Sequence, residues 1–147
     1  MFKKYAPHIS FLTLLLIVSC ATKPQSDVDT PEYHFKAGMR AIDNEDYQQS
    51  ISSFQRSVDL DSKFALGYRG LGLANAYLKN NKNAKDFASK CASRGSKDPD
   101  ALSLSARVWI TMRDSEKRWL KRSEDLLEKA LKRDKDHEGS QYWFGVA

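Results

Sequence analysis

The feature that most constrains this fold is a helical pattern that recurs after 34 residues. Small residues at Ala37, Gly38 and Ala41 precede a polar break at 43–46. Beyond the break, an amphipathic stripe has steps of three and four residues, at Tyr47, Ser50, Ile51, Phe54, Ser57 and Val58. The same theme returns one period later, at Leu71-Gly72, Ala84 and Cys91. A self-similar period of this length predicts stacked helical hairpins and hence an all-α fold.

These residues resemble the tetratricopeptide repeat (TPR), whose 34-residue unit is a helix–turn–helix. With Pro31 as repeat position 1, Gly38 falls on the small position 8 of the family, and Ser50, Phe54 and Ser57 fall on positions 20, 24 and 27. The chain departs from the family at Ala41, which replaces an aromatic residue, and at Ser62, which replaces a proline. An unrelated all-α hairpin with a chance match is the alternative interpretation.

A third repeat follows with a shifted register. Ala106 and Trp109 take positions 8 and 11, but Ser123, Leu127 and Ala130 match only if about five residues are inserted near 113–119. We therefore expect a longer loop or an extended helix there. The resemblance implies a TPR-type α-solenoid of about three and a half repeats over 31–147, with units near 31–64, 65–98 and 99–137 and a partial unit at 138–147.

Local signals place the helices. Thr30 and Asp98 are expected N-caps, each followed by a proline at the first helical position, and Gly95 is an expected helix end. The predicted helices lie near 31–42, 47–60, 64–79, 83–94 and 119–133, with a further one starting at Pro99. The aromatic stretch 142–147 resembles the start of the first helix of a fourth repeat. It indicates a fragment of a longer product, or a segment packed on the third repeat, or a surface for self-association.

The first thirty residues have the pattern of a targeting segment. Lys3 and Lys4 precede an apolar stretch from Ile9 to Val18, which is too short for a membrane span. Ile17-Val18-Ser19-Cys20 resembles the lipobox of bacterial lipoproteins, which implies a signal peptide over 1–19 and diacylglycerol and acyl chains on Cys20. The polar segment that follows, to residue 30, reads as a flexible tether.

Two alternatives remain for this segment: a secretory signal cut after Ala21, and a short anchor that is never cleaved. The resemblance implies a protein held in the cell envelope, and the absence of aspartate after Cys20 indicates the outer membrane, facing the periplasm.

The rest of the sequence offers no arrangement typical of catalysis, a metal or a cofactor. His34 and His137 are isolated and expected to be exposed, and Cys91 is expected to be a buried thiol.

Hydrophobic residues make up 41% and charged residues 29%, which indicates a globular chain. The formal net charge of +5 is too small to indicate nucleic-acid binding. The densest basic cluster, at Lys117, Arg118, Lys121 and Arg122, reads as a solvated face, or else as a surface for lipid headgroups or an acidic partner.

What remains is a binding surface. In TPR proteins, positions 2, 5, 9, 12 and 13 line a groove. The resemblance therefore implies a peptide-binding groove with Phe35, Met39, Ile42, Arg69, Leu73, Tyr77, Arg107 and Ile110 as its main residues, together with Glu32, Asp43, Leu66, Ala76, Asp100, Ser103 and Thr111. The alternative is that Met39, Ile42 and Leu73 belong partly to the core. Phe35 and Met39 replace the lysine and asparagine with which some family members hold a chaperone's C-terminal carboxylate.

We therefore expect a membrane-anchored, non-enzymatic adaptor or scaffold that binds a protein or peptide partner. The alternative is a non-catalytic module of a longer envelope enzyme or assembly factor whose remaining part lies beyond Ala147.

Overall fold

The computed structural model describes residues 29–147, and within this range the chain is helical, with seven helices and no strand. The helices are α1 (Pro31–Asp43), α2 (Tyr47–Leu60), α3 (Ala65–Tyr77), α4 (Asn81–Arg94), α5 (Pro99–Thr111), α6 (Trp119–Arg133) and α7 (Glu138–Val146). The predicted all-α class is confirmed for these residues. The expected signal peptide, Cys20 and most of the tether lie outside the described residues.

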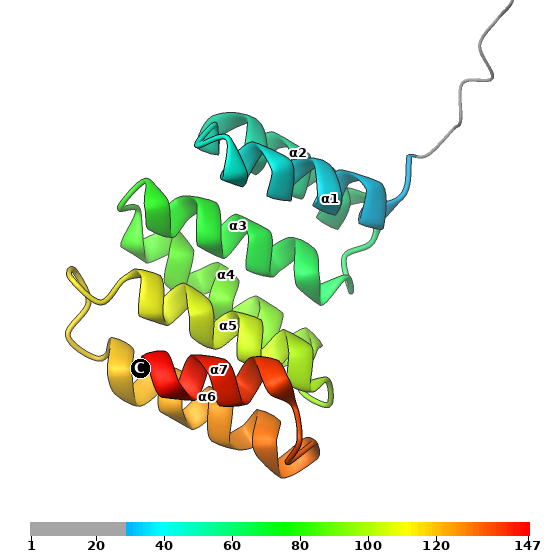
Figure 1. Cartoon of the computed structure of the whole chain (residues 1–147). Coiled ribbons are helices and arrows are strands. Elements are labelled where there is room, and N and C mark those ends of the chain that lie inside the picture. Colours follow the sequence, from blue (N-terminus) through cyan, green and yellow to red (C-terminus); the bar gives the residue numbers. More distant parts are fainter. Residues whose placement is uncertain (1–28) are drawn as a thin grey trace, which may run out of the picture.

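Successive helices form antiparallel pairs that stack in chain order (Figure 1). Helices α1 and α2, α3 and α4, and α5 and α6 pack closely within each pair, and α7 packs on α5 and α6. The odd-numbered helices lie side by side in one layer, which we call the front layer, and α2, α4 and α6 form the back layer (Figure 1).

Small residues allow neighbouring helices to approach each other closely, both between the two layers and within the front layer. A Cβ built on Gly38 would lie 2.5 Å from the Phe54 ring, so the fully buried Phe54 of α2 fits against the bare backbone of α1. Ala106 is also fully buried, and a Cβ on Gly72 would lie 3.3 Å from Val108. These three positions are the ones at which the repeat pattern predicts small side chains.

The helix ends follow the predicted capping signals. The Thr30 hydroxyl accepts a hydrogen bond from the Tyr33 amide at 3.2 Å, and Asp98 caps α5 in the same manner, each before a proline. Gly95 is the C-cap of α4, where a side chain would collide with Ala101. Such caps satisfy amides and carbonyls that have no partner within the helix.

Two features of the second helix pair, α3 and α4, differ from expectation. Helix α3 ends at Tyr77 rather than near Lys79, which adopts a φ of 58°, and α4 begins at Asn81 rather than near Asn83. The polar run 80–83 thus supplies the first turn of α4, since asparagine is as acceptable at a helix start as in a loop. In the third repeat, the insertion forms a loop over 112–118, which Glu116 ties to α4 through an ion pair with Lys85 at 2.6 Å.

None of the helices in residues 29–147 combines the length and the apolar character that crossing a membrane requires.

Candidate functional site

The front layer holds the residues predicted to line a groove, and the structure divides them into two groups. Ile42, Leu73 and Ile110 are buried, and Ile42 and Leu73 pack into the shared hydrophobic core. Buried apolar side chains of this kind leave no unmet hydrogen bond for a ligand to supply. The alternative interpretation that Ile42 and Leu73 are core residues is therefore the one that the packing favours.

The second group keeps part of its surface free. Phe35 and Met39 are partly buried against the core, Arg107 is half-buried, and Tyr77 is exposed and stacks on Tyr47 with ring centroids 5.1 Å apart. The sequence analysis missed Trp143, which α7 carries to the front layer, where the Arg107 guanidinium lies 5.3 Å from its ring centroid. Residues 142–144 are all aromatic, so the helical periodicity of the sequence could not show which ring would face inward.

Arg69 is the most unusual residue of the front layer. Its side chain extends from α3 toward α1, where its guanidinium lies 5.4 Å from the Phe35 ring centroid. Nη2 contacts the Met39 sulfur at 3.6 Å, which is a weak acceptor. The residue is only 6% exposed, and its Nε is buried without a hydrogen-bond partner. Among the described residues, no carboxylate lies within ion-pair distance of Arg69 or Arg107.

The electrostatics of Arg69 reflect this lack of compensation. Burial, and after it the positive charge of Arg107, lower the pKa of the Arg69 guanidinium from its ordinary value to about 10. The side chain therefore remains a cation at neutral pH. A buried charge without a partner opposes folding, whereas an arriving anion would be bound strongly there because little water competes for the guanidinium.

The two histidines of the described region are not free surface residues, contrary to expectation. His34 Nε2 lies 2.6 Å from an oxygen of Asp29. His137 caps α7: its Nδ1 accepts a hydrogen bond from the Ser140 amide at 3.0 Å, and its Nε2 lies 3.0 Å from an oxygen of Asp100 on α5. Long-range packing brings α7 to the start of α5, and the spacing of residues within the sequence could not show it.

The Asp100, His137 and Ser140 side chains form a chain of contacts without the properties of a catalytic triad. Ser140 is fully buried and lies beside the same nitrogen that caps the helix, so its hydroxyl cannot reach a substrate. Within 29–147, no three His, Cys, Asp or Glu side chains are grouped to hold a metal ion. The arrangement fastens α7 to α5.

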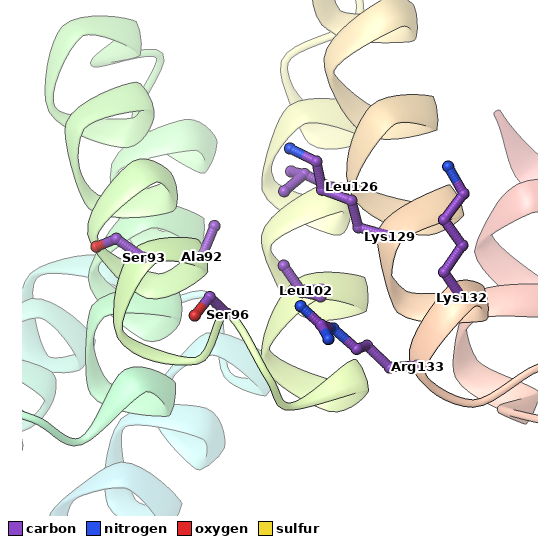
Figure 2. Close-up of a pocket in the computed structure, with 8 residues that line it drawn as sticks. All are labelled: Ala92, Ser93, Ser96, Leu102, Leu126, Lys129, Lys132 and Arg133. Carbon is purple, nitrogen blue, oxygen red and sulfur yellow. The ribbon is translucent and has the colours of Figure 1, made fainter.

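The back layer contains a hollow that the sequence analysis did not predict. It lies between α4 and α6 (Figure 2). Its volume is 640 Å³. Ala92, Ser93 and Ser96 form one wall, α6 forms the other, and Leu102 of α5 lies between them. The α6 wall carries Leu126, Lys129, Lys132 and Arg133.

A second hollow of 320 Å³ continues along the same two helices, because it shares Ala92, Leu126 and Lys129 with the first. Its further lining includes Trp109 and Arg122, whose guanidinium lies 5.9 Å from the indole centroid. We call the two hollows together the α4–α6 groove. The basic cluster singled out in the sequence contributes only Arg122 to it. The remaining cations are Lys85 of α4 and the three from the last two turns of α6, Lys129, Lys132 and Arg133.

In comparisons with known proteins, no protein-family model and no curated protein matches this chain.

Proposed function

We propose that this chain is a non-catalytic adaptor that captures a protein segment on its front layer. In this proposal it is a TPR-type α-solenoid lipoprotein. Acyl chains on Cys20 hold it at the bacterial outer membrane, where it faces the periplasm. Support for the solenoid comes from the in-order stacking of helix pairs and from the small residues at Gly38, Gly72 and Ala106, where helices cross.

The unpartnered Arg69 is the observation that carries the proposal. A protein that needed only a stable core would favour an apolar residue at this position, because burying a lone guanidinium opposes folding. A partner that delivers an anionic group to Arg69 and Arg107 would supply the missing hydrogen bonds. Charge-assisted hydrogen bonds of this kind contribute about 1.5–3 kcal/mol each.

The neighbouring side chains suit a polypeptide partner. Phe35, Met39, Tyr77 and Trp143 present apolar or aromatic surface around the two arginines. An aromatic and aliphatic surface with a few charged groups is typical of protein-binding sites. The lipid anchor would keep this surface at the membrane, and so raise the local concentration of the bound segment there.

The proposal can be tested by affinity capture from an envelope extract with the full chain and two variants. Arg69→Met removes the unpartnered charge, and Arg113→Met removes an exposed charge in the loop that follows α5. We expect a set of proteins captured by the parent chain and by Arg113→Met but not by Arg69→Met, with affinities for Arg69→Met weaker by roughly tenfold or more.

The fold must persist for this result to count. We expect the helical circular dichroism of Arg69→Met to match the parent, with equal or higher stability, because replacing a buried charge by an apolar side chain of similar size is often stabilising. Capture of the same proteins by all three chains would contradict the proposed role of Arg69 and the front layer.

A further inference from the structure

We propose that the α4–α6 groove is a second protein-binding site, on the opposite layer, that accepts an acidic amphipathic segment of a partner. The groove runs between two helices that both pack on α5 but make almost no contact with each other. It is open along its length, and Figure 2 shows Lys129 and Arg133 reaching from α6 into the gap toward α4. This shape suits a chain segment that lies along the two helices.

The larger hollow of the groove carries positive charge only. The 640 Å³ hollow is lined by three cationic side chains, Lys129, Lys132 and Arg133, and by no acidic residue. None of the three forms an ion pair within the described chain. Asp125 and Glu128 precede Lys129 and Lys132 by one helical turn, yet neither pair comes within ion-pair distance. These cations therefore remain available to an anionic partner.

The other hollow of the groove is more mixed. It carries Lys85, Arg122 and Lys129 with two carboxylates, Asp86 and Asp125. The Lys85 ammonium is already paired with Glu116 of the α5–α6 loop. Acidic residues of the partner are therefore expected to lie at the end of the groove formed by the last turns of α4 and α6.

The floor of the groove is apolar and recessed. Leu102 and Trp109 are buried side chains of α5, and Leu126 is half-buried. An apolar side chain entering from a partner would cover mainly the exposed part of Leu126, because Leu102 and Trp109 keep only 3% and 8% of their surface exposed. This burial is favourable in proportion to the area removed from water. A membrane cannot make this contact, because the apolar groups lie below the cationic rim rather than protruding from it. These features favour a protein segment over a lipid bilayer.

The preceding repeat provides an internal comparison. A hollow of 530 Å³ lies in the corresponding place between α2 and α4, and its polar lining consists of neutral amides at Gln48, Gln55, Asn75, Asn80 and Asn83. A gap between back-layer helices thus recurs along the stack. Of these two gaps, only the one between α4 and α6 is lined by cations. Their presence is not a requirement of the fold, and we infer that they serve recognition.

The test uses the full chain and a synthetic probe of about 15 residues, with leucine on one helical face and glutamate on the other, because amphipathic helices bind grooves through such a face. The matched probe has glutamine in place of every glutamate. Binding is measured by fluorescence anisotropy at low and moderate salt. We expect the acidic probe to bind, its affinity to fall with added salt, and the glutamine probe to bind at least tenfold more weakly.

Three variants locate the site. Lys129→Gln, Lys132→Gln and Arg133→Gln together remove the cationic wall, and we expect this triple variant to bind the acidic probe roughly tenfold more weakly. Lys36→Gln, Lys63→Gln and Lys82→Gln together remove the same number of exposed charges elsewhere, and affinity should change less than twofold. Ser93→Glu places a carboxylate on the opposite, exposed wall and should weaken binding several-fold.

The outcomes separate this proposal from its competitors. Equal weakening by both triple variants would show that only net charge matters, and would overturn the proposed site. Binding to phosphatidylcholine vesicles that contain phosphatidylglycerol, lost in the groove triple variant and without any binding of the acidic probe, would overturn it in favour of a lipid site. Arg69→Met should leave probe binding unchanged, so the two proposed sites stand or fall independently.

Discussion

The ring of Phe54 on α2 occupies the space that a side chain on Gly70 of α3 would need. The same ring also fills the space beside Gly38 of α1, so that one aromatic side chain joins the first two helix pairs at two glycines without side chains. Glycine lowers helix propensity, yet it occurs at these points of α1 and α3 because the helices lie too close to Phe54 for even a methyl group.

Gly70→Ala should therefore destabilise the domain. Overpacking against the Phe54 ring costs about 1–3 kcal/mol, which exceeds the gain of up to about 1 kcal/mol from replacing a helical glycine with alanine. Urea unfolding followed by circular dichroism measures the difference. The matched control is Gly145→Ala, where nothing lies within 4 Å of the added methyl group and stability should be unchanged or slightly higher. Similar results for the two variants would contradict the packing described here.

The carboxyl of Asp29 links the start of α1 to α2. Hydrogen bonds from Arg56 and then from His34 lower the pKa of Asp29 from 3.8 to about 2. Because the folded-state pKa is the lower one, this contact stabilises the fold above about pH 4, and its contribution is lost as the pH falls through 2. We expect the carboxyl carbon of Asp29 to titrate near pH 2 by NMR, and Arg56→Gln to return its pKa toward 3.8. An unchanged titration in that variant would show that the contact is not maintained in solution.

His137 fastens α7 to the rest of the stack. Its ring caps the Ser140 amide and reaches Asp100, so His137→Ala removes a helix cap and a link to α5 together. Loss of a cap typically costs about 1 kcal/mol. We expect faster amide hydrogen exchange throughout α7, with little change in α1 to α4. His34→Ala is the control because its contact with Asp29 lies at the other end of the stack, and it should leave exchange in α7 unchanged.

Cys20 carries the proposed membrane anchor. Cys20→Ser should move the protein from the membrane fraction to the soluble fraction, since multiple acyl chains bind a bilayer far more firmly than a polar peptide does. Detergent phase partitioning of cell extracts measures this change, with Cys91→Ser as the matched single-cysteine control. Unaltered partitioning of the Cys20→Ser variant would rule out the lipid anchor.

Much of the fold could be predicted from the chain because its signals are local. The caps at Thr30 and Asp98 and the shifted register before α6 depend on neighbouring residues only. The small positions at Gly38 and Ala106 follow from periodicity, which reports which face of a helix meets another. Asn80 and Asn81 show the limit of such signals, because the same residues are suited to a turn and to a helix start.

The candidate sites were harder to predict because they depend on depth and on distant contacts. Repeat position alone could not distinguish Leu73, which is a fully buried core residue, from Arg69, which is a nearly buried cation whose Nε has no hydrogen-bond partner. The α4–α6 groove arises from the spacing of helices in three dimensions. The cations at its wall were visible in the sequence, but the gap that they border was not.

Because Cys91 lies in the interior, the reactivity of its thiol can report local opening of the fold. Its thiol is fully buried and lies 3.4 Å from the Ala101 carbonyl, and burial raises its pKa to about 11. The nucleophilic thiolate is therefore scarce, and access is closed while α4 and α5 remain packed. In a chain whose other cysteine is replaced, alkylation at Cys91 would proceed only through transient separation of these helices. The rate of a simple labelling reaction would then report how often these two helices separate.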